Sequence, residues 1–279
     1  MQALEISGPA EGPYGVALTD GKAWATLVHA GAVAQVDGRR FELGDGARPM
    51  VIVADPDGGV RFTRNGDDRI GRIDAEGNIS AVEVPGSPYG VCIGPDNALW
   101  CTLMSTDEVA RIAADGTVTT YPIGIPGAFP AMITATDELW FTLNQGNAIG
   151  RMTTDGVVTT YPLPTEGAGP VGISAGPTGV WFVEILADQA GRITGDGKID
   201  EFALPPGSKP HAVVALPDGG CWITLWGTGS LARLDADGVV QREVELGAGS
   251  EPHGLAVDAD GSVWVALENR SLAHLPAGE

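Results

Sequence analysis

The chain has 279 residues, with 16 lysines and arginines against 36 aspartates and glutamates, so its formal net charge is −20 at pH 7. This excess of negative charge disfavours nucleic acid and anionic membranes as partners. The N-terminus lacks the charged and apolar regions of a signal peptide, no segment is long enough to cross a bilayer, and the three cysteines have no metal or redox spacing. We therefore expect a cytoplasmic monomer with buried free thiols.

A proline recurs seven times at intervals of roughly 40 residues, which is typical of propeller blades. The residue that follows it changes from copy to copy. The pairs are Pro13-Tyr14, Pro49-Met50, Pro88-Tyr89, Pro130-Ala131, Pro170-Val171, Pro210-His211 and Pro252-His253. Histidine follows the proline in the last two copies alone, which separates these two positions from the repeated architecture.

Each repeat also carries the pattern of four short strands. A tryptophan, replaced once by Arg61, lies on an alternating apolar run, and a short apolar segment follows it. Six copies then have Asp-Gly or Glu-Gly before a last alternating segment, which is a strong hairpin signal because these residues tolerate the positive φ of tight turns. The sequence thus predicts an all-β fold, a seven-bladed β-propeller of four-stranded antiparallel blades, with residues 1–279 as one domain.

The seventh repeat lacks its fourth segment, and the beginning of the chain supplies a match for it. Leu4-Glu5-Ile6 has the same pattern as Val82-Glu83-Val84. We expect the N-terminal strand to complete the last blade as its outer strand, because such closure hides unpaired strand edges. This topology makes the first blade a neighbour of the seventh, so Tyr14 should lie beside His253.

A cluster of polar and aromatic side chains is predicted at one mouth of the propeller. If Val257 pairs near Val263, antiparallel pairing places His253 opposite about Leu267, with Glu251 and Glu268 at the same end of the hairpin. Two glutamates around a histidine favour a site for a hard cation, and oxygen ligands suit Mg²⁺, which often uses one or two carboxylates and several waters. The expected cluster comprises Tyr14, His211, Trp226, Glu251, His253 and Glu268.

The other histidines and the tryptophan call for separate interpretations. His29 and His274 are expected to be surface or structural residues. Trp226 lies outside the series of structural tryptophans, so it is either a stacking surface for an apolar ligand or a core residue. Glu251 and Glu268, taken singly, are as readily surface acids as metal ligands. The sequence has no nucleophile elbow, phosphate loop or HExxH motif.

The motifs together resemble those of the virginiamycin B lyase family over nearly the whole chain. They are GPYG at the start, strands ending in GRI, KPHA in the sixth repeat and EPHG with a following W and LE in the seventh. The resemblance implies that His253 is the general base, that His211 is a second catalytic histidine, and that Glu251 and Glu268 are associated with Mg²⁺. It also implies that Tyr14 lines the substrate pocket, and Tyr89, His211 and Trp226 are assigned to substrate binding with it.

The resemblance further implies a reaction in which a cyclic depsipeptide antibiotic, a streptogramin B, is opened at its threonine ester without addition of water. Two alternatives stay open. One is a metal-dependent lactonase or esterase on a similar propeller, and the other is a propeller that binds a ligand or a protein without catalysis. This sequence departs from the family pattern at the end of the tryptophan strand, where the family has a glutamate. Leucine replaces that glutamate at Leu27, Leu103, Leu143 and Leu225, in blades other than the last.

Overall fold

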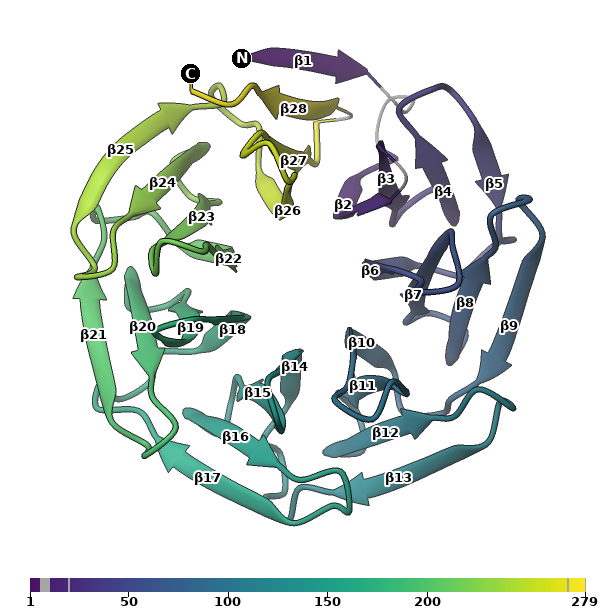
Figure 1. Ribbon diagram of the computed structural model, residues 1–279, viewed down its shortest axis with the longest axis horizontal. Helices are drawn as coiled ribbons and strands as arrows, with labels where there is room; N and C mark the ends of the chain where they lie inside the picture. Colours follow the sequence, from purple (N-terminus) through teal and green to yellow (C-terminus); the bar gives the residue numbers. More distant parts are fainter. Residues whose placement is uncertain (6–10, 20, 270, 279) are drawn as a thin grey trace. The chain divides into compact units, whose positions relative to one another are not determined.

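The computed structural model describes residues 1–5, 11–19, 21–269 and 271–278, and this part of the chain consists of strands, turns and bends without a helix. The strands form seven antiparallel sheets of four (Figure 1). The predicted fold class, a seven-bladed β-propeller, is confirmed. Among the described residues no helix is long and apolar enough to span a bilayer.

The chain divides into two compact units, residues 1–89 with 249–279 and residues 90–248. Three sheets belong to the first unit. Blade one contains β2 (Pro13–Thr19), β3 (Lys22–Leu27), β4 (Ala32–Gln35) and β5 (Arg40–Glu42). Blade two contains β6 (Pro49–Ala54), β7 (Val60–Arg64), β8 (Arg69–Ile73) and β9 (Ile79–Glu83). Blade seven contains β26 (Pro252–Val257), β27 (Val263–Leu267), β28 (Ser271–Leu275) and, from the other end of the chain, β1 (Gln2–Glu5).

Four sheets make up the second unit, apart from the first two residues of β10. Blade three contains β10 (Pro88–Ile93), β11 (Leu99–Leu103), β12 (Glu108–Ile112) and β13 (Val118–Pro122), and blade four contains β14 (Pro130–Ala135), β15 (Leu139–Leu143), β16 (Ala148–Met152) and β17 (Val158–Pro162). Blade five contains β18 (Pro170–Gly176), β19 (Gly179–Glu184), β20 (Gln189–Ile193) and β21 (Ile199–Ala203), and blade six contains β22 (Pro210–Ala215), β23 (Cys221–Leu225), β24 (Ser230–Leu234) and β25 (Val240–Glu245).

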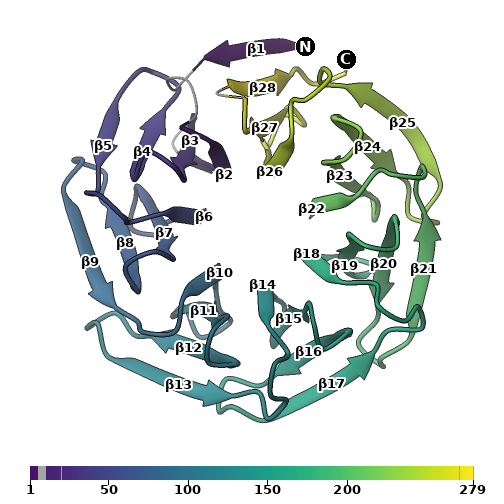
Figure 2. The same ribbon diagram turned by 180° about the vertical axis from the view of Figure 1, so that it is seen from behind.

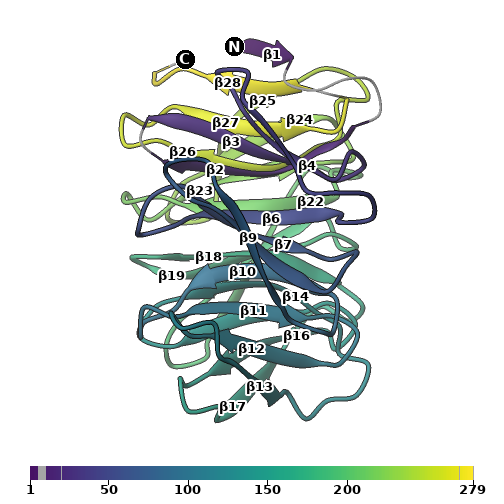
Figure 3. The same cartoon turned by 90° about the vertical axis from the view of Figure 1, so that its right-hand side faces the viewer.

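The N-terminal strand completes blade seven as the sequence predicts. β1 pairs antiparallel with β28, with Gln2 opposite His274 and Leu4 opposite Leu272. Both face views show β1 beside β28 (Figures 1 and 2), and the side view shows it at the edge of this sheet (Figure 3). The predicted strand included Ile6, which lies outside the described residues.

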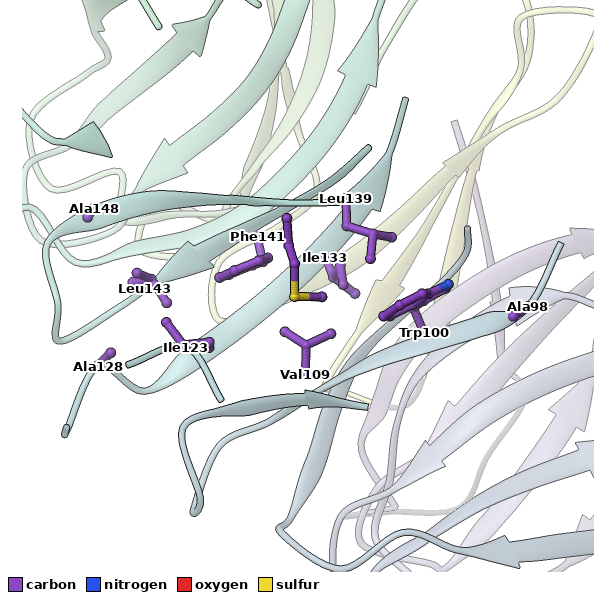
Figure 4. Close-up of a cluster of buried hydrophobic side chains, with 11 residues drawn as sticks. Ala98, Trp100, Val109, Ile123, Ala128, Ile133, Leu139, Phe141, Leu143 and Ala148 are labelled. Carbon is purple, nitrogen blue, oxygen red and sulfur yellow. The ribbon is translucent and has the colours of Figure 1, made fainter. Parts of the chain in front are cut away.

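Burial follows the position of a strand within its blade. In blade six, every residue of β23 is buried, whereas β25 is mostly exposed. A strand buried on both faces reads as a continuous apolar run, and an edge strand tolerates charge. Five of the repeated tryptophans are buried in the core, and Trp100 packs with Val109, Ile133, Leu139 and Phe141 in a cluster between blades three and four (Figure 4).

The repeated prolines mark a β-bulge at the start of the first strand in six blades. In blade seven, Pro252 pairs with Leu267 and the register shifts before Leu255 pairs with Val265. Five other blades have the same shift. The expectation that His253 lies opposite about Leu267 is therefore wrong by one residue, because Pro252 takes that place and His253 falls within the bulge.

In four copies the residue after the proline is held through its backbone. Its carbonyl oxygen accepts a hydrogen bond from a threonine hydroxyl of the preceding blade, from Thr26 to Met50 at 2.6 Å, from Thr63 to Tyr89 at 2.8 Å and, in the second unit, from Thr102 to Ala131 at 2.5 Å and from Thr142 to Val171 at 2.7 Å. Because the contact uses only the main chain, the side chain at this position is free to vary between copies. This explains how methionine, tyrosine, alanine and valine occupy equivalent places.

Candidate active site

His253 and Glu268 form the centre of the candidate site. Nε2 of His253 lies 2.8 Å from Oε2 of Glu268, in hydrogen-bonding contact. His253 is 8% exposed, whereas the Glu268 side chain is 29% exposed. The pair therefore joins a nearly buried imidazole to a carboxylate that reaches solvent.

Local backbone geometry places Glu251, His253 and Glu268 at the same end of blade seven. The N–H of Glu268 donates to the carbonyl of Glu251 at 3.2 Å, which confirms the predicted neighbourhood of the two glutamates. The β-bulge between Pro252 and Leu255 directs His253 away from the regular alternation, a common use of bulges beside functional sites. Gly254 is required there, because a Cβ on it would lie 2.7 Å from the carbonyl oxygen of Tyr14.

Glu251 occupies a position with a backbone constraint that all seven copies share. Its φ is 48°, in the left-handed region, and the residue before each repeated proline has a positive φ as well. The equivalents are Gly12, Arg48, Ser87, Phe129, Gly169 and Lys209. A non-glycine residue pays a conformational cost in this region. The backbone conformation alone would favour glycine at this position, so it does not account for the glutamate.

Tyr14 and Tyr89 line the same part of the first unit. The Tyr14 ring lies against the His253 imidazole, with centroids 4.5 Å apart and planes inclined by 31°. The hydroxyl groups of Tyr14 and Tyr89 are hydrogen-bonded to each other. The prediction that Tyr14 lies beside His253 is confirmed, and Tyr89 joins the group through Tyr14.

The ionisation of the cluster follows from its burial. Burial lowers the pKa of His253 below its usual value and outweighs the opposing influence of Glu268. Burial acts to raise the pKa of Glu268, but hydrogen bonds to His29 and His253 outweigh it and leave that pKa lowered. Burial also raises the pKa of Tyr14, with a further contribution from Tyr89. At neutral pH the site holds a neutral imidazole, a carboxylate and protonated phenols.

His29 is the member of the cluster that sequence reasoning missed. Its Nε2 lies 3.0 Å from Oε1 of Glu268, so the Glu268 carboxylate joins His29 to His253. The His29 side chain is 50% exposed. His29 directly follows Val28, which has in blade one the position that Glu268 has in blade seven. The N–H of Val28 donates to the carbonyl of Gly12, as the N–H of Glu268 donates to the carbonyl of Glu251. The sequence carried this signal, because Val28 and Glu268 each lie four residues after the tryptophan of their repeat. His274, by contrast, stacks on Trp264 at 4.2 Å, as a structural residue does.

His211 and Trp226 belong to the second unit. His211 is the second residue of β22, half-buried, at the place in blade six that His253 has in blade seven. The N–H of Trp226 donates to the carbonyl of Lys209 at 3.2 Å, and the Lys209 ammonium lies 5.4 Å from the centre of the indole ring. Nε1 of Trp226 is buried and has no hydrogen-bond partner among the described residues.

Comparison with known proteins decides the family. The sequence profile of the virginiamycin B lyase family matches residues 1–275. A virginiamycin B lyase from Nocardia farcinica is 44% identical over 228 residues, which are 78% of each chain. The chain belongs to the virginiamycin B lyase family. Its relatives carry the name of a lyase, so the prediction of a lyase-type enzyme is confirmed at the level of the family.

Solved structures of family members agree with this assignment over the full length. The virginiamycin B lyase of Staphylococcus aureus is 36% identical, with a TM-score of 0.94 over 99% of this chain and 98% of that one. A streptogramin B lyase is 35% identical, with a TM-score of 0.92 over 98% and 97% of the two chains. A catalytically inactive histidine-to-alanine variant of the S. aureus protein, solved with quinupristin, is 36% identical, with a TM-score of 0.93 over 99% and 98%.

The chemistry of the donor set fits the Mg²⁺ that the family resemblance implies. Glu251 and Glu268 offer carboxylate oxygens from adjoining positions, and no thiolate is involved. Among the described residues, no group of three or more histidine, cysteine, aspartate or glutamate side chains forms a complete metal cage. Mg²⁺ commonly keeps several waters and uses one or two carboxylates, so these two glutamates suit a largely hydrated ion.

Proposed function

We propose that this protein inactivates streptogramin B antibiotics by opening the cyclic depsipeptide at its threonine ester through elimination. The observation that carries the proposal is the contact between His253 and Glu268, with Tyr14 against the imidazole, in a member of the virginiamycin B lyase family. The relative solved with quinupristin supports the substrate class, and its inactivation by loss of one histidine supports a histidine-dependent reaction.

His253 acts as the general base in this proposal. It removes the α-proton of the threonine residue, the bond between the β-carbon and the ester oxygen breaks, and an alkene and a free carboxylate remain. No water enters the products. The lowered pKa of His253 keeps its imidazole neutral near pH 7 and therefore able to accept the proton. The proton later leaves to solvent.

Glu268 orients the base. A carboxylate only accepts hydrogen bonds, so Nε2 of His253 carries the hydrogen and Nδ1 carries the lone pair. Glu268 also stabilises the imidazolium that forms after proton transfer. Nδ1 is buried in the structure, so the substrate reaches it when a covering side chain shifts. Tyr14 packs on this imidazole and is our candidate for that movement.

The remaining assigned residues serve substrate binding and charge stabilisation. Glu251 and Glu268 would hold Mg²⁺, which when bound would supply electrostatic stabilisation of the negative charge that develops on the substrate. We assign His211 to the ester oxygen or to the leaving carboxylate. Trp226 and Tyr89, with Tyr14, supply aromatic surface for the depsipeptide.

Mass spectrometry of a streptogramin B incubated with the protein tests the reaction type. Elimination gives a linear product of the same mass as the antibiotic, whereas a lactonase or esterase gives a product heavier by one water. A parallel incubation with chelator, followed by addition of Mg²⁺, tests the metal requirement. A heavier product would rule out the elimination, and an unchanged cyclic antibiotic would favour a binding role.

A further inference from the structure

The second unit contains a buried acidic group away from the candidate active site. Glu184, the last residue of β19, is 0% exposed, and neither of its carboxylate oxygens has a hydrogen-bond partner in the described part of the chain. The side-chain oxygen of Gln189, directly opposite on β20, is buried and lacks a partner as well. Leaving such acceptors buried and unsatisfied is costly, so something outside the chain is expected to satisfy them.

Glu201 brings a second carboxylate to this place. Gln189 pairs with Ala203 and Gly191 pairs with Glu201, so Glu201 lies two residues along β21 on the face that carries Gln189 and Glu184. Its carboxylate accepts hydrogen bonds from the N–H of Thr165 at 3.0 Å and the Thr165 hydroxyl at 2.8 Å. These bonds hold Glu201 in position and leave lone pairs on both oxygens.

The corresponding place in blade four is apolar. Leu143 and Ala148 pair there as Glu184 and Gln189 do, and Leu143 lies among Ile123, Ala128 and Phe141 (Figure 4). The counterpart of Glu201 is Thr160, which pairs with Gly150. Blade five therefore has a carboxylate and an amide at two positions where blade four has apolar residues, and a carboxylate at a third where blade four has a threonine.

Other polar residues at these positions have partners within the chain. In blade two, Arg64 takes the place of Glu184 and donates to Asp67 and to the carbonyl of Leu43. In blade six, Glu243 takes the place of Glu201 and accepts a hydrogen bond from Ser230 at 2.7 Å. Blade five differs because two carboxylates and an amide oxygen come together there. The oxygens of Glu184 and Gln189 accept no hydrogen bond from the described residues.

We propose that Glu184, Gln189 and Glu201 form a binding site for a hard divalent cation, with calcium as the best match. Two carboxylates compensate its charge, and carboxylate and amide oxygens are ligands that calcium prefers in flexible arrangements of six to eight oxygens. A single proton shared between Glu184 and Glu201 satisfies one oxygen pair and leaves the other Glu184 oxygen and Gln189 without a partner. Bound waters complete the coordination.

The role of this cation is structural. It joins Glu184 and Gln189 in the interior of blade five to Glu201, which is bonded to Thr165 in the connection between blades four and five. The site is independent of the proposed function, because none of its residues belongs to the set assigned to the antibiotic reaction. Loss of one does not imply loss of the other.

Calcium binding to the chelator-treated full-length protein tests the proposal. At pH 8, the wild type should bind one more equivalent of Ca²⁺ than Glu184→Leu, which carries the residue that blade four has at this position. The same difference should appear in a Glu251→Gln background, which separates this site from the candidate active site. Saturating Ca²⁺ should raise the Tm of the wild type by about 5 °C and leave that of Glu184→Leu unchanged.

A second variant guards against a folding defect. Gln189→Ala introduces the residue that blades one and four carry, Ala32 and Ala148, and should weaken Ca²⁺ binding about tenfold. Equal Ca²⁺ stoichiometry in the wild type and Glu184→Leu would overturn the proposal. So would a wild-type Tm that responds to pH and to neither Ca²⁺ nor Mg²⁺, since that behaviour indicates a shared proton.

Discussion

The ring of Tyr14 lies 4.5 Å from that of His253, although the two residues come from opposite ends of the chain. Pairing of β1 with β28 and packing of β2 beside β26 bring these ends together. The candidate active site therefore depends on the closure of blade seven by the N-terminal strand.

Replacing His253 with alanine should strongly reduce turnover of a streptogramin B, because it removes the base. General-base catalysis contributes about 10² to 10⁴-fold, so residual activity should fall by at least the lower figure. Loss of antibiotic measured by chromatography checks this. His274→Gln is the matched control, since His274 stacks on Trp264 away from the cluster, and it should keep wild-type activity. Equal activity in His253→Ala and the wild type would contradict the assignment.

Replacing Glu268 with glutamine should move the acid limb of the kcat/KM profile to lower pH. Burial lowers the pKa of His253 and Glu268 opposes that effect, so removal of the negative charge lowers the pKa further. The rate at neutral pH should also fall about 10 to 100-fold, because the imidazole loses its orienting partner. The profile should be measured at a constant, saturating Mg²⁺ concentration. An acid limb that moves to higher pH would refute the role of Glu268.

Replacing Glu251 with glycine should separate stability from activity. Glycine relieves the left-handed φ of 48°, so the free energy of unfolding should stay level or rise by up to about 1 kcal/mol. Activity and Mg²⁺ dependence should weaken because a carboxylate is lost. Urea denaturation and turnover assays check the two effects, and Glu251→Gln controls for the charge alone. Full activity in both variants would exclude Glu251 from the site.

Replacing Tyr14 with phenylalanine should have a smaller effect than replacing it with alanine. Phenylalanine keeps the ring against His253 and loses the hydroxyl contact with Tyr89, at a cost of about 1 kcal/mol in unfolding free energy. Alanine removes the surface that packs on the imidazole, so KM should rise several-fold further. Steady-state kinetics of both variants test this. Equal KM values for the two would show that the ring does not contact the substrate.

Replacing Glu184 with leucine should remove a pH-dependent loss of stability in the chelated protein. Burial, with a contribution from Glu201, raises the pKa of Glu184 from its usual 4.5 to about 8. The folded state then binds the proton more tightly than the unfolded state, so its stabilising effect is complete below pH 4.5 and is lost as the pH rises to about 8.

The stability difference between Glu184→Leu and the wild type should therefore widen, on the order of a few kcal/mol, between pH 5 and pH 8.5. Urea denaturation at both pH values in excess chelator measures it. A constant difference would show that the carboxyl of Glu184 keeps an ordinary pKa.

The sequence by itself determined the repeat, the four strands of each blade and the completion of blade seven by the N-terminal strand. These features depend on local patterns, namely alternation, turn glycines and the repeated proline, and on the matching segment at residues 4–6. The neighbourhood of Tyr14 and His253 follows from that topology. So does the meeting of Glu251 and Glu268, because the two ends of one hairpin must lie together.

The tertiary structure decided what the side chains do with these positions. The bulge after Pro252 displaced His253 from the expected pairing, and His29 proved to contact Glu268 although it lies on another blade. The sequence also does not show that the oxygens of Glu184 lack hydrogen-bond partners. A glutamate at the end of a predicted strand is expected at the surface, and only the surrounding residues of the folded chain show that it is buried. Burial and hydrogen-bond partners depend on contacts between segments that are distant in the sequence. A repeat pattern predicts the backbone that brings those segments together, but not which side chains become buried or which polar atoms find a partner.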